Sequence, residues 1–487
     1  MASRQTIIVG AGLGGLALAA RLAHAGHDVT LLEKNSAPGG RCGTLDEGGY
    51  HFDTGPTLLL MPDVLDRLFS SLGASLSDYL TLTRMSPNYR LHFTDGTHFD
   101  FFSDPRRTAE VLEQIEPGAA AQFDRFLEES GFCYRTARAS FVERNFTTAG
   151  EFFTPGNLGL LYRMKAHYRL YQRICHFFKD ERLRQAFSFQ TMYLGISPFR
   201  SPALYSLLPY TELTEGIWYP QGGMHSLARA IARLAEERGC RIRYDAPVSR
   251  IETSGSKATG VTLESGERIE ADLVIANADL PYVVESLLPP EPQRRWKFTS
   301  SGFLIHLGLN RRYDDVPHHS VFFSSDYARN FREIFEQKRL PQDPAFYLCR
   351  PTATDPTVAP PGCDVLYLLA PMPHLEGKVD WSAAASTLRS RFFERLRGIG
   401  IAGLEESIVV ERTWTPHDFA SVLNLASGCA FGLSHDMLQV GYLRPHNRHR
   451  RWDNLYFVGA STHPGTGIPM VLFSAELVEQ RIAKEWQ

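Results

Sequence analysis

Three absences bound what this chain of 487 residues can do. Its seven cysteines include no C-x-x-C pair, so we expect reduced thiols and no metal ligand set. No run of about 18 apolar residues occurs, and we therefore expect no transmembrane helix. The opening MASRQT has no signal-peptide pattern, which favours a cytoplasmic protein. With 51 basic against 54 acidic residues, the net charge of −3 gives no reason to expect nucleic acid as a partner.

A glycine-rich turn stands between two strand-like segments near the N-terminus. The β-branched run Ile7–Val9 precedes it, an Ala/Leu-rich helical segment follows, and a second apolar run ends at Glu33. The turn contains Gly10, Gly12, Gly14 and Gly15. In this G-x-G-x-x-G spacing the glycines permit a tight turn, close approach to a pyrophosphate and close helix–strand packing, while the acid accepts from a ribose hydroxyl. The pattern predicts a Rossmann-like dinucleotide site.

The C-terminal stretch NLYFVGASTHPGTGIPMVLFSAELV follows the same order of strand, Gly/Pro-rich turn and helix. Close-approach glycines at a helix N-terminus suit a second contact with the same cofactor. We expect five residues here to lie against it: Gly459, Ala460, Gly467, Ile468 and Pro469.

The residues after Glu33 extend the first motif to E-x-x-x-x-P-G-G-R. This extension resembles the FAD-binding signature of the amine oxidase and carotenoid desaturase clan of flavoproteins. The resemblance implies FAD, with the turn Gly55–Pro56 near the isoalloxazine and the backbone of Val248 beside the adenine. It also places four residues of the extension at the cofactor: Lys34, Gly39, Gly40 and Arg41.

These segments predict an α/β fold whose FAD-binding domain is discontinuous. We assign residues 1–60, 222–285 and 435–487 to this Rossmann-like domain. A helical, membrane-facing region is expected over 61–221, and 286–434 carries strand-like runs typical of a mixed substrate-binding sheet. Together the two latter segments form an α+β substrate domain.

Longer stretches resemble bacterial and fungal phytoene desaturases, among them EGIWYPQGGMHSLARAIARLAEERG and LRPHNRHRRWDNLYFVGASTHPGTGIPMVLFSAEL. This resemblance implies non-covalent FAD, a linear isoprenoid polyene such as phytoene as substrate, and oxygen or a quinone as electron acceptor. A C30 diapophytoene desaturase, a carotenoid isomerase or a carotenoid end-group oxidase remains open. Outside the family, the rivals are an amine oxidase and a flavin-free lipid escort protein of the Rab-escort kind.

No catalytic base stands out from the sequence. His463 lies in the loop expected near the flavin, where it is either a base or a structural histidine. Glu212 and Glu215 could face the substrate, although acids beside a loop are usually solvated. A hydrocarbon substrate needs apolar lining, for which one region offers Phe141, Phe146, Phe152, Phe153, Phe177, Phe178, Phe187, Phe189, Tyr193, Phe199, Tyr205 and Tyr210. Some of these aromatic residues are expected to line a tunnel, and the rest to fill a core.

The segment from Asn157 to Asp180 carries five basic residues and no acid before its last residue. Its apolar residues recur at spacings of three and four, which is typical of an amphipathic helix. A basic amphipathic helix favours peripheral contact with an anionic membrane surface, whereas the alternative is a helix packed on its own core.

Overall fold

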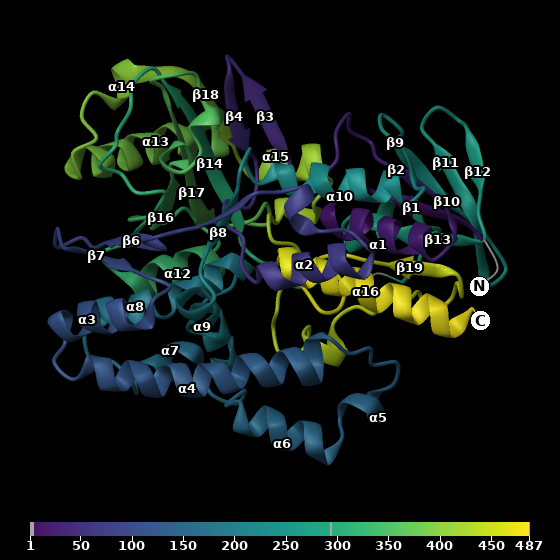
Figure 1. Cartoon of the computed structure of the whole chain (residues 1–487), viewed down its shortest axis with the longest axis horizontal. Helices are drawn as coiled ribbons and strands as arrows, with labels where there is room; N and C mark the ends of the chain where they lie inside the picture. Colours follow the sequence, from purple (N-terminus) through teal and green to yellow (C-terminus); the bar gives the residue numbers. More distant parts are fainter. Residues whose placement is uncertain (1–3, 293–294, 487) are drawn as a thin grey trace.

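The computed structural model describes residues 4–292 and 295–486. Its first layer is a five-stranded parallel sheet in the order β19-β13-β1-β2-β9. The strands come from three distant parts of the chain: β1 (Gln5–Val9), β2 (Asp28–Leu32), β9 (Arg241–Arg243), β13 (Leu273–Ala276) and β19 (Leu455–Phe457). The two ends of the described chain therefore meet on this side of the molecule (Figure 1).

Both faces of this sheet are covered, which is why its central strands are almost wholly apolar. Ile8 of β1 belongs to the buried cluster formed with helices α1 (Leu13–His24), α10 (His225–Glu237) and α16 (Ile468–Glu485). Its neighbours Ile7 and Val9 point the other way, into a cluster with an antiparallel sheet. That sheet comprises β10 (Val248–Ser254), β11 (Lys257–Leu263) and β12 (Arg268–Glu270). The expected α/β fold with a Rossmann-like layer is confirmed.

One expected strand is in fact two. The alternating run from Cys240 to Thr253 divides into β9 and β10, which belong to different sheets. Between them Asp245 adopts a left-handed φ of 51°, and Pro247 offers no N–H for a ladder. The N–H of Ala246 instead donates to the carbonyl of Glu33 at 2.8 Å, which brings this connection to the end of β2.

The second large layer is a seven-stranded sheet in the order β18-β14-β17-β16-β15-β6-β7, antiparallel except for the β15–β6 pair. Its strands are β6 (Tyr89–His92), β7 (His98–Phe101), β14 (Ser301–Leu309), β15 (His319–Phe322), β16 (Phe346–Cys349), β17 (Asp364–Met372) and β18 (Ile408–Trp414). Alternate residues of β14 such as Phe303 and Ile305 pack with α13 (Trp381–Gly398) on one face. Gly302 and Leu304 point to the opposite face, where a cavity lies.

The region over 61–221 is largely helical, but it also supplies β6, β7 and the small β5–β8 pair (Leu82–Arg84 and Trp218–Pro220). Its longest helix, α4, runs with α6 along the lower edge in Figure 1. The helices are α2 (Pro62–Ser71), α3 (Pro105–Ile115), α4 (Ala119–Ala137), α5 (Ala149–Phe152), α6 (Pro155–Arg163), α7 (Leu170–Ile174), α8 (Glu181–Ala186) and α9 (Leu207–Thr214).

The prediction of a single amphipathic helix from Asn157 to Asp180 is wrong, because the segment contains α6 and α7 as separate helices. Helix α6 ends at Arg163, and Lys165, two residues later, adopts a left-handed conformation with a φ of 59°. The N–H of Ala166 donates to the Leu161 carbonyl and that of Lys165 to the Tyr162 carbonyl, which is the Schellman pattern that terminates helices. Met164 and Phe178 of this segment are buried, so these two apolar residues pack on the protein's own core, as the alternative interpretation expects.

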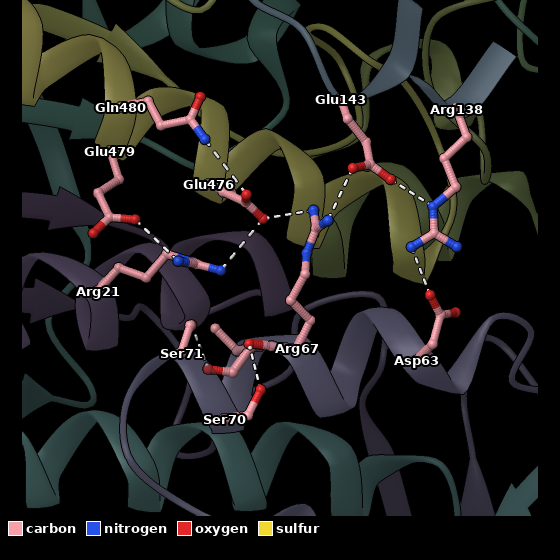
Figure 2. A network of polar contacts seen from close by, with 11 residues as sticks. Arg21, Asp63, Arg67, Ser70, Ser71, Arg138, Glu143, Glu476, Glu479 and Gln480 are labelled. Carbon is pink, nitrogen blue, oxygen red and sulfur yellow. Dashed lines mark hydrogen bonds and ion pairs between the residues drawn. The ribbon is translucent and has the colours of Figure 1, made fainter. Parts of the chain in front are cut away.

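A network of ion pairs fastens the helical region to the helices beside the first sheet (Figure 2). Arg67 of α2 contacts Glu143 at 2.9 Å and Glu476 of α16 at 2.7 Å. Arg138, at the end of α4, contacts Asp63 and Glu143, each at 2.5 Å. Charged pairs that share partners contribute more to stability than isolated surface pairs, so this network stabilises the contact between the helical region and the first layer.

Candidate active site

A cavity of about 1000 Å³ begins at the carboxyl ends of β1, β2 and β13 and extends into the helical region. In open α/β sheets this edge is where ligands bind, because loops and helix N-termini converge there. The cavity lining includes all but one of the residues predicted at the cofactor: Gly10, Gly12, Gly14, Glu33, Lys34, Gly39, Gly40, Arg41, Gly55, Pro56, Val248, Gly459, Ala460, Gly467, Ile468 and Pro469. The exception is Gly15, which packs beneath the turn, where a Cβ would overlap the Gly10 carbonyl oxygen.

The two glycine turns pack against each other at this end of the cavity. A Cβ on Gly14 would lie 3.2 Å from the Gly459 Cα and 3.0 Å from Asn277 Oδ1. Asn277 also holds the first turn, because its Nδ2 donates to the Gly10 carbonyl at 3.1 Å. The Asn277 side chain thus holds the two turns together, and the backbone of both lines the cavity, as a cradle for a diphosphate requires.

Glu33 lies at the end of β2 with only 5% of its surface exposed. One carboxylate oxygen accepts from the Ala11 N–H at 2.7 Å, and the other accepts from the N–H and Nδ2 of Asn35 at 3.0 and 2.9 Å. These bonds fix the acid at the cavity wall, and Oε2, which accepts only one of them, retains a lone pair for a further donor such as a ribose hydroxyl.

Asp279 was missed from the sequence, although it joins three segments at the cavity. Its carboxylate accepts from Ser461 Oγ at 2.6 Å and lies 3.5 Å from the Arg41 guanidinium. Burial lowers the pKa of Arg41, and the Asp279 charge opposes that shift. Asn277 and Asp279 directly follow the strand predicted at Leu273–Ala276, so the rule that strand ends carry ligands was the available signal.

The C-terminal loop is held from behind by Arg444, which is only 1% exposed. Its guanidinium donates to the carbonyls of Ala460 at 2.5 Å and Thr462 at 2.9 Å, and to that of Ser434 at 3.3 Å. Burial lowers the pKa of Arg444 to about 10, which still leaves it charged at neutral pH. Arg444 lies in the stretch LRPHNRHRRWDNLYFVGASTHPGTGIPMVLFSAEL, but the sequence alone predicts no role for it.

Beyond the cradle the cavity is lined mainly by apolar side chains. Six of the aromatic residues proposed for a tunnel line it: Phe141, Phe152, Phe153, Phe189, Tyr193 and Tyr205. Others fill a core, among them Phe178 and Phe187, whose rings stack at 4.4 Å. The sheet contributes Leu304, Tyr347, Tyr367 and Leu369 from the opposite side. This part of the cavity suits a long hydrocarbon better than a polar metabolite.

The three candidate acid–base residues occupy different surroundings. His463 lines the cavity, its Nε2 donates to the Arg144 carbonyl at 3.0 Å, and burial lowers its pKa to about 4. Glu212 is fully buried, so the expectation of a solvated acid is wrong for it. Burial also raises the pKa of Glu215. A role in catalysis for His463 stays a prediction.

His318, His319 and Cys349 form a buried cluster with one potential ligand atom each, all within 4.8 Å of one another. His318 Nδ1 already contacts Thr354 Oγ1 at 2.7 Å, and His319 Nδ1 contacts the Tyr347 hydroxyl at 2.6 Å. Burial lowers the pKa of His319 to about 3. Pairing of β15 with β16 brings these residues together, which no local spacing could reveal.

The family model described as flavin containing amine oxidoreductase matches residues 13–483. A zeta-carotene-forming phytoene desaturase from Myxococcus xanthus is 47% identical over 98% of this chain and 94% of its own length. A phytoene desaturase from Phycomyces blakesleeanus is 39% identical over 98% of this chain and 85% of its own length. This chain belongs to the phytoene desaturase family of flavin-containing oxidoreductases.

Among solved structures, an oxidoreductase from Methanosarcina mazei has the same fold, with a TM-score of 0.67 and 18% identity over 98% of this chain and 99% of that one. Membership confirms the resemblance found in the sequence and makes the protein a flavin-dependent oxidoreductase. Within residues 4–292 and 295–486, no helix combines the length and apolar character that crossing a bilayer requires.

Proposed function

We propose that this chain is an FAD-dependent desaturase that introduces conjugated C=C bonds into a linear isoprenoid polyene, and that its substrate is phytoene. One observation carries the proposal: a single cavity joins a glycine cradle suited to a diphosphate with an apolar region large enough for a long hydrocarbon. The named activity of the relatives supports the same reaction.

FAD is the flavin that the cradle fits, because a second nucleotide half is needed to occupy the site between Glu33, Val248 and the first turn. When bound, FAD supplies the acceptor for the hydride that leaves an allylic carbon. Arg41 and Asp279 position the loops around it, and the apolar lining orients the polyene and excludes water.

The flavin is held without a covalent bond in this proposal. Cys42 is the cysteine found in the cavity lining among the described residues, and its thiol donates to the Met224 carbonyl at 3.2 Å. Burial raises the pKa of Cys42 far above the usual range, so the nucleophilic thiolate is suppressed. Acid precipitation of the purified protein should release the flavin into the supernatant; yellow colour in the pellet would contradict this point.

The cavity mouth lies on a membrane surface in the same proposal. Four cavity-lining side chains are also well exposed, namely Phe153, Tyr162, Met437 and Leu443, and Leu438 beside them is 73% exposed. Arg163 and Arg169 add exposed positive charge near this edge. A polyene dissolved in anionic membrane could enter here without crossing water.

Sedimentation with anionic vesicles at low salt tests the membrane contact. Tyr162→Asp combined with Leu438→Asp should move the protein from the pellet to the supernatant. Val409→Asp is the matched control, because Val409 is 57% exposed but lies on β18, far from α6 in Figure 1. Equal sedimentation of the double variant and the control would argue against this surface.

The reaction is tested by expressing the chain in a host engineered to accumulate phytoene. Coloured extracts are expected, and their absorption maxima report the number of conjugated bonds. Colourless cells that contain soluble yellow protein would reject phytoene as substrate. Turnover by the purified protein with oxygen or a quinone as the sole oxidant then identifies the electron acceptor.

A further inference from the structure

Glu212 is a carboxyl group buried without a cationic partner. It lies on α9 and has no exposed surface. Its Oε2 accepts from the Tyr89 hydroxyl at 2.8 Å, and Gln190 Nε2 donates to the same hydroxyl at 3.1 Å. Its Oε1 has no partner that meets hydrogen-bond geometry, and within the described residues no Arg, Lys or His forms an ion pair with it. Burying an unpaired carboxylate in this way lowers the free energy of unfolding, which points to a functional role for Glu212.

Tyr193 stands between this carboxyl and the cavity. Its side chain lines the cavity, and its hydroxyl lies beside the Glu212 carboxylate. Tyr193 is also close to Tyr347, whose hydroxyl accepts from Thr57 Oγ1 at 2.9 Å. Thr57 follows the Gly55–Pro56 turn that the family places near the flavin ring. The hydroxyl of Tyr193 is therefore a polar group in a mainly apolar wall, on the side where the polyene would react.

The electrostatics suit a group that takes up and releases a proton near neutral pH. Burial raises the pKa of Glu212 to about 7, and the adjacent side chains of Tyr193, Tyr89 and Gln190, of which Tyr89 donates a hydrogen bond to the carboxylate, oppose that shift. These neighbours come from β6 and from the 3-10 turn at Phe189–Leu194, and none of them is a cation. Burial keeps the pKa of Tyr193 well above its usual value, so this residue stays neutral and can relay a proton between two partners.

We propose that Tyr193 and Glu212 form the relay that accepts the proton released by desaturation. This inference rests on the proposed function. The hydride leaves one carbon of the polyene for the bound flavin, and the neighbouring carbon loses a proton. The electron pair of that second C–H bond becomes the new C=C. The proton passes to the Tyr193 oxygen while the Tyr193 hydroxyl proton passes to the Glu212 carboxylate. After the product leaves, the proton returns from Glu212 through Tyr193 to water in the emptied cavity, which restores the carboxylate for the next turnover.

The test uses the full chain with FAD bound and phytoene in vesicles, with turnover followed from about pH 5 to pH 9. For the unaltered protein, kcat should rise with pH through about 7. Glu212→Gln and Tyr193→Phe should each lower kcat by roughly 100-fold, with KM changed less than about threefold, and should abolish the rise with pH. Glu236→Gln, an exposed carboxyl on α10, serves as the control and should keep the unaltered profile.

An active Glu212→Gln or Tyr193→Phe protein with the original pH profile would overturn the relay. If Glu212→Gln loses its flavin or does not fold, Tyr193→Phe decides, because it removes only a hydroxyl from the cavity wall. Failure of the unaltered protein to desaturate phytoene contradicts the proposed function itself, and so is distinguished from failure of the relay alone.

Discussion

At its nucleotide end the cavity is walled by backbone, and at its far end it is walled by side chains. The cradle consists of Gly10, Gly12 and Gly14 within one turn, faced by Gly459. The far end combines Tyr193 of the helical region with Tyr347 and Leu369 of the seven-stranded sheet. A diphosphate is recognised by N–H groups and a helix end, which demand local glycines, whereas a hydrocarbon is recognised by shape and apolar area. Recognition of a diphosphate therefore produces a short motif in the sequence, whereas recognition of a hydrocarbon produces only apolar residues scattered along the chain.

The largest effect is expected where the cradle is narrowest. Gly14→Val would place side-chain carbon against Gly459 and Asn277, and overpacking of this kind costs about 1–3 kcal/mol and displaces the two turns that form the cradle. The purified variant should be colourless, with flavin content below about a tenth of the unaltered protein. Gly398→Ala, where an added Cβ meets nothing within 4 Å, should keep both colour and thermal midpoint. A yellow Gly14→Val protein would show that the flavin lies elsewhere.

At the far end of the cavity, the buried Glu212 should make the stability of the protein depend on pH, an effect that we do not expect from the cradle. The folded-state pKa of Glu212, about 7, exceeds its ordinary value of 4.5, so the folded chain binds more protons between these values and loses stability as pH rises. The charged form costs about 3 kcal/mol above pH 7, a cost that Glu212→Gln removes.

The thermal midpoint of Glu212→Gln relative to the unaltered protein should therefore increase between pH 5 and pH 8. Any pH-independent cost of burying the amide cancels in this difference. An offset that does not change with pH would mean that Glu212 titrates at its ordinary pKa.

A smaller effect separates FAD from FMN. Glu33→Ala removes a charged acceptor at the expected ribose site, which is worth about 1.5–3 kcal/mol, or roughly 10- to 100-fold in affinity. Titration of flavin-free protein should show this loss for FAD and little change for FMN, which has no adenosine half. Glu270→Gln, on the exposed edge of β12, should bind both flavins normally. Equal losses for both would place Glu33 away from the adenosine.

The smallest effect concerns the ion pairs that join the two regions (Figure 2). Arg67 is 35% exposed, so solvent screens its two partners and Arg67→Met should cost about 1 kcal/mol or less. The loss should shrink in high salt, as measured by the midpoint of denaturant unfolding. Arg233→Met, which breaks an exposed pair with Glu237 within α10, should change nothing measurable.

The same contrast explains how much could be foreseen from the sequence. Glu33, Arg41 and Gly459 could be predicted because each belongs to a motif of a few residues; they line one cavity, and their contact with the cofactor stays a prediction. Asp279 and Arg444 were not assigned roles, since the contacts of Asp279 with Arg41 and of Arg444 with Thr462 join segments that share no local motif. The burial of Glu212 was also missed, because it depends on β6 and α9 packing around it.

The prediction of secondary structure failed where the local backbone conformation interrupts a periodic pattern of apolar residues. The amphipathic pattern over Asn157–Asp180 is real, but Lys165 ends the helix through a Schellman turn that spacing alone does not reveal. Likewise, the alternation across Asp245 spans two sheets. In both cases the backbone conformation of one or two residues outweighs a side-chain pattern that extends over many more.

The most direct measurement mixes the purified flavoprotein with phytoene in vesicles without oxygen, and records the flavin and polyene absorbance together. If one cavity holds both ends of the reaction, the flavin should bleach at the same rate as conjugated polyene appears, in a fixed ratio. A flavin that stays oxidised while phytoene is unchanged would contradict a desaturase, even if the cradle still binds FAD.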